Sequence, residues 1–198
     1  MKLIFDIGSN NGDDILYYLH KADLVVAVEA NPKLCKLISK RFNKEIKDKR
    51  LFIENAAISD SNNKETIFYI NRKNDHVSSI VPPNNLENWE RLTVKTITFI
   101  ELLNKYGKPD YIKIDIEGAD NIFLTQLLNS KFKPKYISAE CHNLDVFSTL
   151  SEKLEYETFN LVEGWNVGKI YKKKKIFSLH LKKFINYSFP LNSAGPFG

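Results

Sequence analysis

The stretch that decides the fold lies at the start of the chain and reads Lys2-Leu-Ile-Phe-Asp-Ile-Gly-Ser-Asn-Asn-Gly12. A short apolar run that ends in an acid and a glycine is typical of a buried parallel strand that leads into a loop. Residues 11–21 follow with apolar side chains at helical spacing and with acidic residues in the first turn, where the helix dipole favours carboxylates. The opening therefore predicts a strand, a glycine-containing loop and a helix.

The same alternation of strand and helix patterns repeats along the chain. Further strands are predicted at 24–28, 51–53, 93–97, 111–114 and 136–139, and further helices at 32–46, 98–106, 119–128 and 145–154. Extended pairs are predicted for 56–60 with 65–70 and, as a C-terminal hairpin, for 157–161 with 175–181. Residues 71–92 follow neither period and predict a loop or lid.

This order of elements predicts an α/β fold: a Rossmann-like, doubly wound, mainly parallel seven-stranded sheet with an antiparallel C-terminal hairpin at one edge. We expect a single domain over residues 1–198, because the length suits one domain and no linker interrupts the pattern. The composition, 43% hydrophobic and 27% charged, excludes a disordered chain. The longest apolar run, residues 24–28, excludes a membrane span, and Cys35 and Cys141 form no motif, so we expect a cytoplasmic protein.

A net charge of +5 raises the question of nucleic-acid binding. Only four of the 29 basic residues are arginines, whereas recognition of bases and phosphates relies on the planar guanidinium group. The composition therefore favours a solvated basic surface, and nucleic acid is not the expected partner. The run Lys172–Lys175 is interpreted as a solvated hairpin edge, with an anionic acceptor or surface as the alternative.

The residues that end each predicted strand are almost all small or acidic. In a doubly wound sheet the ligand binds beyond the carboxyl ends of the strands, so these residues are the ones expected to meet it. Gly8 and Gly12 let the backbone turn and approach a ligand closely, and Glu29, 21 residues after Gly8, is placed to accept both hydroxyls of a ribose. The pattern predicts a cofactor that contains a nucleoside.

The charges near the first loop favour one such cofactor. A dinucleotide needs a helix N-terminus free of anions, but Asp13 and Asp14 occupy it and Asp6 and Asp115 are expected nearby. Two like charges about 4 Å apart cost about 4 kcal/mol at an effective dielectric constant near 20. S-adenosylmethionine carries no phosphate and has a cationic sulfonium and a cationic ammonium group, so we expect S-adenosylmethionine.

Two motifs match those of a known family. Residues 5–13 read F-D-I-G-S-N-N-G-D beside the family's D-x-G-A-N-x-G-D, and residues 111–120 read Y-I-K-I-D-I-E-G-A-D beside its K-I-D-x-E-G-A-E. Residues 28–32 and 55–60 match as well, while Ser9 and Asp120 replace the usual Ala and Glu. The chain resembles the FkbM-type methyltransferases, a branch of the class I S-adenosylmethionine-dependent methyltransferases.

The resemblance implies O-methylation of a hydroxyl on a sugar, glycan or specialised metabolite. It assigns Glu29 to the ribose, Asn55 and Ala56 to the adenine, and Asp115 to the transferring methyl group. The residues expected to bind the cofactor are Asp6, Gly8, Ser9, Asn10, Gly12, Asp14, Glu29, Ala30, Asn55, Ala56 and Asp115. The expected acceptor is a small molecule or a glycan, and an anionic acceptor stays open.

Four residues are candidate catalytic bases: Asp115, Glu117, Glu140 and His142. The same set suits a divalent cation such as Mg²⁺ or Mn²⁺, which we keep as a minor alternative because no ligand spacing demands it. Asp115 and Glu117 are alternatively caps of the following helix, and His142 an ordinary loop histidine. Two other functions stay open: an RNA methyltransferase that uses the lysine-rich edge, and a non-catalytic protein that binds the cofactor.

Overall fold

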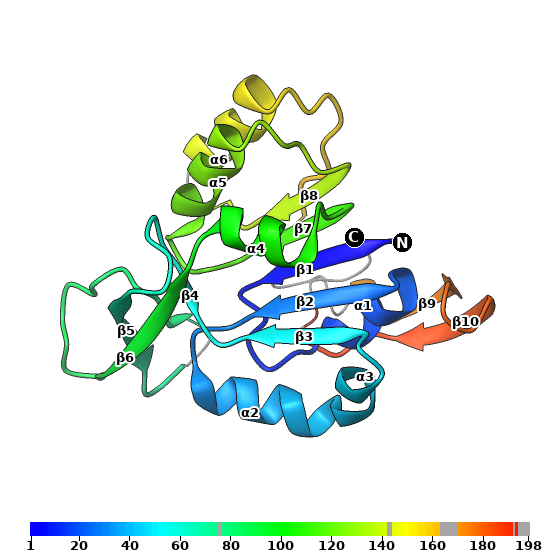
Figure 1. Ribbon diagram of the computed structural model, residues 1–198, viewed down its shortest axis with the longest axis horizontal. Helices are drawn as coiled ribbons and strands as arrows, with labels where there is room; N and C mark the ends of the chain where they lie inside the picture. Colours follow the sequence, from blue (N-terminus) through cyan, green and yellow to red (C-terminus); the bar gives the residue numbers. More distant parts are fainter. Residues whose placement is uncertain (75–76, 142–143, 163–169, 192, 194–198) are drawn as a thin grey trace.

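The computed structural model describes residues 1–74, 77–141, 144–162, 170–191 and 193 (Figure 1). Its helices are α1 (Ile15–Lys21), α2 (Pro32–Arg41), α3 (Asn43–Lys47), α4 (Phe99–Tyr106), α5 (Asp120–Asn129) and α6 (Leu144–Ser148), the last followed by a π-helical turn at Thr149–Lys153. Its strands are β1 (Leu3–Ile7), β2 (Leu24–Val28), β3 (Leu51–Glu54), β4 (Ala57–Ile58), β5 (Glu65–Asn71), β6 (Trp89–Ile97), β7 (Tyr111–Ile114), β8 (Tyr136–Ala139), β9 (Lys173–Ser178) and β10 (Lys183–Ser188). None of the described helices is long and apolar enough to cross a membrane.

The central sheet has five parallel strands in the order β3-β2-β1-β7-β8 (Figure 1). The chain moves outward from β1 to β2 and β3 and then crosses to the other side of β1 to form β7 and β8. Position β1/β7 is therefore the switch point of the sheet, where such folds bind their ligands. The predicted α/β doubly wound class is confirmed, but the predicted number of seven strands in one sheet is wrong.

The strands that were expected in the central sheet but are not part of it belong to two smaller sheets. β6 is longer than the predicted 93–97 because residues 89–92 pair with Phe68–Asn71 of β5, which shortens the predicted loop 71–92 by five residues, Asn71 and 89–92. The predicted pairing of 56–60 with 65–70 is wrong as well. β4 pairs in parallel with β6, and β5 pairs antiparallel with the other side of β6, so the order is β4-β6-β5.

Helices cover both faces of the central sheet because side chains of a strand alternate between its two faces. Leu3, Phe5 and Ile7 of β1 pack into a core that they share with α4, α5 and α6. Ile4 of β1 packs on the opposite face, in a second core shared with α1 and α2. The helix predicted over 32–46 is divided at Phe42, whose φ of −116° and ψ of 30° interrupt the helical path between α2 and α3.

A separate two-stranded hairpin, β9–β10, covers the outer side of α1. The rings of Tyr187 and Phe189 lie 5.7 and 5.1 Å from the ring of Tyr17, and the amide of Leu179 donates to the carbonyl of His20 at 2.8 Å. The expected C-terminal hairpin is present, but its predicted strands and its position are corrected. Residues 157–161 form no strand, and the hairpin packs on a helix instead of extending the central sheet.

Candidate functional site

A cavity of about 1570 Å³ opens at the carboxyl ends of β1, β2, β7 and β8. It is lined by ten of the residues expected to bind the cofactor or to act on the substrate: Gly8, Ser9, Asn10, Asp14, Glu29, Ala30, Ala56, Asp115, Glu117 and Glu140. Asp6, Gly12 and Asn55 were expected with them but are not among the lining residues. His142, the remaining candidate, lies outside the described residues.

The loop after β1 is held at the switch point by a close contact with β7. Gly8 has φ of +83°, and a Cβ atom at this position would lie 1.8 Å from the carbonyl oxygen of Asp115. Its amide and that of Ser9 donate to the carbonyl of Val28 at 2.9 and 3.1 Å. Gly12, with φ of +78°, packs against Ile15 and Ile38 beneath the loop, facing the core rather than the cavity.

Glu29 is buried and ties two loops together. Its Oε2 accepts from the amide of Asn10 at 2.8 Å, and its Oε1 accepts from the amide of Asn31, the N-cap of α2, at 2.7 Å. Burial raises the pKa of Glu29 to about 7, in spite of these two hydrogen bonds, which lower it. A carboxylate can accept about four hydrogen bonds, so Glu29 keeps capacity for two hydroxyl groups of a ligand.

Asn55 supports the same strand end from behind. Its side-chain amide donates to the carbonyls of Glu29 and Ala30, both at 3.0 Å. Asn55 therefore positions residues of the cavity wall and is not itself part of the wall. Ala56, the next residue, does line the cavity, and its small side chain leaves room there.

A buried ion pair lies under the loop. Asp6 of β1 and Lys113 of β7 are register partners in adjacent strands, and the Lys113 Nζ lies 3.8 Å from the Asp6 Oδ1, 3.3 Å from the Asp115 Oδ2 and 2.8 Å from the Gly8 carbonyl. Burial raises the pKa of Asp6 to about 6, although Lys113 lowers it. The nearby carboxylates of Asp115 and Asp6 outweigh burial and raise the pKa of Lys113. Lys113 therefore stays charged.

Lys113 lines the cavity, but our interpretation of the sequence did not single it out. A signal was present, because Lys113 interrupts the apolar strand Tyr111–Ile114 at the position that faces the same side as Asp6. A lysine inside a buried strand requires an anionic partner. Only the pairing of β1 with β7 identifies that partner.

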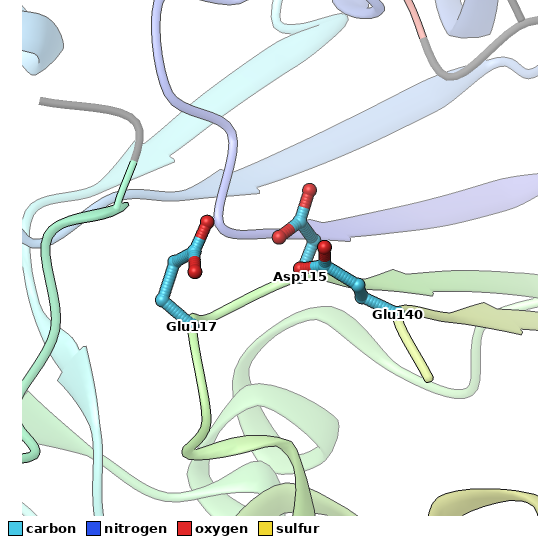
Figure 2. A group of neighbouring side chains, drawn as sticks. All are labelled: Asp115, Glu117 and Glu140. Atoms are coloured by element: carbon cyan, nitrogen blue, oxygen red, sulfur yellow. The ribbon is translucent and has the colours of Figure 1, made fainter. Parts of the chain in front are cut away.

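Three carboxyl groups meet at the ends of β7 and β8. Figure 2 shows Asp115 and Glu117, from the end of β7 and the loop after it, and Glu140, from the end of β8, directed toward the same space. Oxygens of the three groups lie within 4.8 Å of one another. Partial burial, a hydrogen bond with Asp115 and the surrounding carboxylates raise the pKa of Glu140 to about 8. Glu140 therefore holds its proton to a higher pH than an ordinary glutamate does.

Capping does not explain these carboxyl groups. The N-cap of α5 is Ala119, and no side chain caps it. Asp120, the first residue of α5, accepts from the amides of Ile116 and Gly118 at 3.3 and 3.2 Å and so closes the turn itself. Asp115 and Glu117 line the cavity instead.

Two further segments close the cavity. From the region predicted as a lid, Ser78 and Ile80 line it, and the Ser79 hydroxyl donates to the carbonyl of Glu117 at 2.7 Å. From the C-terminal part, Ser193 donates to the Asp14 Oδ1 at 2.5 Å and also lines the cavity. The site is therefore assembled from segments nearly 180 residues apart in sequence.

The end of the cavity along β8 and α6 is aromatic. Tyr136, Phe147 and Phe159 line it with partly exposed rings, and the rings of Phe147 and Phe159 are 5.1 Å apart. Lys135 lies beside them with its Nζ 5.2 Å from the centre of the Tyr136 ring. This end offers flat apolar faces and a positive charge, whereas the end near Asp6 and Asp14 is acidic.

Comparisons with known proteins point in one direction. The family model "Methyltransferase FkbM domain" matches residues 6–161. A crystal structure of methyltransferase FkbM from Methylobacillus flagellatus KT is 15% identical, with a TM-score of 0.54 over 78% of this chain and 38% of that chain, and so shows a similar fold. A precorrin-6y C5,15-methyltransferase from Geobacter metallireducens GS-15 is 14% identical over 94% of this chain and 75% of that chain, with a TM-score of 0.41. No sequence among the curated proteins matches this chain. The chain spans 38% of the length of the first of these structures.

Proposed function

Because the chain belongs to the FkbM methyltransferase family, we propose that it binds S-adenosylmethionine in the cavity and transfers the methyl group to a hydroxyl of a sugar, glycan or specialised metabolite. The observation that supports this best is the state of Asp6. Its side chain is 1% exposed, and neither of its carboxylate oxygens has a hydrogen-bond partner among the described residues. Lys113 is the ammonium group beside both Asp6 and Asp115, so two carboxylates face one cation, and this excess of negative charge at the cavity floor suits a cationic ligand.

The side chains around the loop after β1 fit the proposed cofactor. Asp14 and Asp115 line the cavity near Asp6, so the ammonium and sulfonium groups would meet negative charge. Glu29 would accept the ribose hydroxyls, and Ala30 and Ala56 would leave room for the adenine ring. A pyrophosphate would be repelled by the same carboxylates, which disfavours a dinucleotide.

When bound, the cofactor supplies an activated methyl group on its sulfonium. The residues of this chain then have two tasks: to align the acceptor oxygen with that methyl group and to take the hydroxyl proton. Glu140 is the proposed base, with Asp115 as its hydrogen-bond partner. A base with a pKa near 8 is well matched to neutral conditions, because it accepts a proton readily and a sizeable fraction of it is ionised.

The aromatic end of the cavity supports a sugar-like or aromatic acceptor. The flat faces of Phe147 and Phe159, whose rings are neighbours, suit the apolar face of a sugar ring or a planar metabolite. Lys135 would add attraction for a phosphate or carboxylate on the acceptor. The lid segment, held to Glu117 through Ser79, would exclude water from the reacting atoms.

A divalent cation at Asp115, Glu117 and Glu140 is not required by this proposal. Lys113 already compensates Asp115, and the raised pKa of Glu140 keeps the three carboxyl groups from being ionised together at neutral pH. We expect methyl transfer to continue in excess chelator. If chelator abolished activity and Mg²⁺ or Mn²⁺ restored it, proton transfer to Glu140 would be rejected, and a mechanism in which a bound cation assists ionisation of the acceptor would take its place.

The cofactor is tested by calorimetric titration of the full chain with S-adenosylmethionine and with its demethylated product. We expect Asp6→Asn and Glu29→Gln each to weaken binding at least tenfold. Glu65→Gln, which removes an exposed carboxylate from β5, is the matched control and should leave binding unchanged. Absence of binding by the unaltered chain would overturn the proposal.

Turnover is tested with cofactor labelled in the methyl group and a panel of glycosides, glycans and phenolic compounds. Label should appear on an acceptor hydroxyl, and its position is read by mass spectrometry. Binding of the cofactor without label transfer to any acceptor would instead support the non-catalytic alternative.

A further inference from the structure

The hairpin β9–β10 has an outer face that nothing in the described structure covers. Alternate side chains of its strands face inward, where Ile176 and Tyr187 are buried against α1. The other set, which includes Lys173, Lys175 and Phe177 of β9, faces outward and is exposed. The exposed face of the hairpin therefore carries both apolar rings and lysines.

Two phenylalanines form the apolar part of this face. Phe177 and Phe184 are register partners, are 39% and 63% exposed, and have ring centres 5.2 Å apart. Leu181, in the turn between the strands, is 45% exposed. The neighbouring side chains on the other face of the hairpin are buried against α1, whereas these apolar groups are exposed together. A cluster of exposed apolar groups indicates a binding surface.

Lysines surround these apolar groups. Lys173, Lys175, Lys182 and Lys183 are exposed on the strands and the turn, and the Lys175 Nζ lies 5.4 Å from the centre of the Phe184 ring. Residues 164–198 contain seven lysines and no aspartate or glutamate. The face therefore has no acidic residue of its own segment to neutralise it.

The hairpin tip lies away from the cavity. The amide of Leu179 bonds to His20 near the end of α1, just before β2 begins, whereas the cavity lies at the opposite, carboxyl end of the strands. Figure 1 shows β9 and β10 projecting beyond α1 on the side where the central strands begin. A ligand on this face would dock the protein without entering the cavity.

We propose that the outer face and tip of the hairpin bind the surface of an anionic lipid bilayer. Phe177, Phe184 and Leu181 would enter the region between headgroups and acyl chains, and the lysines would contact anionic headgroups. The proposal does not depend on the function proposed for the cavity.

The composition of the face favours lipid over RNA. The two phenylalanine rings meet at 71°, so the edge of one contacts the face of the other and the two rings do not form a flat platform for bases. Leu181 offers no stacking surface at all. The cations are lysines without a single arginine between residues 170 and 191, which suits point-charge attraction to headgroups more than recognition of phosphates in a fixed geometry.

The test is flotation of the full chain with vesicles of phosphatidylcholine alone and of phosphatidylcholine with 30% phosphatidylglycerol. We expect binding to the anionic vesicles only, weakened by salt. The variant K173E/K175E/K182E/K183E should bind at least tenfold more weakly. The variant F177T/F184T, which keeps β-forming residues and the charge, should also bind several-fold more weakly.

The matched control is K36E/K40E/K44E/K47E on α2 and α3, because these lysines are exposed, carry the same total charge and have no neighbouring aromatic pair. This control variant should keep most of the binding to anionic vesicles. A control that loses as much as the hairpin variant would overturn the proposal, since the attraction would then be due to net charge. Binding to an RNA oligonucleotide but not to anionic vesicles would also overturn it. Calorimetric titration with S-adenosylmethionine should give the same result for the hairpin variants and the unaltered chain.

Discussion

At the scale of single residues, the pairing of Asp6 with Lys113 determines the charge beneath the site. The Lys113 ammonium compensates Asp6 and Asp115 and also holds the Gly8 carbonyl, so one side chain links the loop after β1 to the end of β7. A buried charge that loses its partner is strongly destabilising, whereas an intact buried pair contributes little. Lys113 is therefore needed to keep two acids ionised in the places where a cationic cofactor would need them.

Replacement of Lys113 by methionine should lower the free energy of unfolding by about 3–5 kcal/mol at pH 8, because Asp6 and Asp115 lose their counter-charge. Urea denaturation measures the loss. Lys64→Met, at an exposed position, should change stability little. Addition of Asp6→Asn to Lys113→Met should recover part of the loss, and a double variant as unstable as the sum of the two single variants would contradict the pairing.

Glu140 should determine how the reaction rate depends on pH. Its pKa is raised to about 8, so the ionised base becomes more abundant as the pH rises through that value. We expect kcat/KM to increase with pH, with a midpoint near pH 8 that belongs to the Glu140–Asp115 pair, and to level off about one pH unit above it. Glu140→Gln should reduce kcat by about 10²–10⁴-fold and abolish the rise. An unchanged pH profile in this variant would exclude Glu140 as the base.

At the scale of secondary-structure elements, the site depends on how closely the ends of β1 and β7 approach each other. The loop turns away from β1 at Gly8 directly against the carbonyl of Asp115, and the loop after β7 carries Glu117 with φ of +51°. The turn at Gly8 and the turn at Glu117 both place polar groups at the switch point, only a few residues after the strands end. A side chain at position 8 would separate the two strand ends, and with them the acids that line the cavity.

Gly8→Ala should therefore destabilise the protein more than the same substitution at another glycine that also has a positive φ. Gly107→Ala is the matched control, since Gly107 has φ of +91° but no atom within 4 Å of the place that a Cβ would occupy. Backbone strain should cost about 1–3 kcal/mol in both, and the clash with Asp115 a further 1–3 kcal/mol or so in Gly8→Ala, roughly the cost of overpacking. Equal losses in urea denaturation would show that the contact between β1 and β7 relaxes freely.

At the scale of the whole molecule, the buried acids around the cavity link folding to pH. The pKa values of Asp6 and Glu29 are raised to about 6 and about 7, so each group holds its proton to a higher pH in the folded than in the unfolded chain. The stabilisation from such a group is complete below its unfolded pKa and is lost as the pH rises through its folded pKa. A cationic ligand that needs the ionised groups would bind with release of protons.

Unfolding free energy of the protein without ligand should accordingly be higher at pH 5.5 than at pH 8, by about 2 kcal/mol. Urea denaturation at the two pH values measures the difference. Glu29→Gln, which does not titrate, should reduce it, whereas the exposed Glu65→Gln should not. In parallel, S-adenosylmethionine should bind more tightly at pH 8 than at pH 5.5. A stability that rises from pH 5.5 to pH 8 would contradict the raised pKa values of these buried groups.

Much of the central fold could be predicted because its strands are local apolar runs. Residues 111–114 and 136–139 were predicted with the observed bounds, and the residues that end the strands were predicted as the site, where most of them line one cavity. The C-terminal hairpin was predicted and is present, but its second strand could not be identified, because residues 157–161 and 183–188 both have extended character and only packing against α1 selects the latter. Helical spacing is an incomplete guide to burial as well, because the apolar side chains of Leu16 in α1 and Leu37 in α2 are 40% and 47% exposed.

The sequence by itself determined the doubly wound class, the order of strand and helix, and the acidic and small character of the strand ends, since each follows from periodicity and residue type within a short window. Tertiary structure alone decided which of these residues meet. Lys113 finds Asp6 because β1 and β7 are neighbours, Ser193 reaches Asp14, and Tyr17 is buried because the hairpin covers α1. These contacts depend on strand order and on packing between distant segments, and a local pattern carries no information about either.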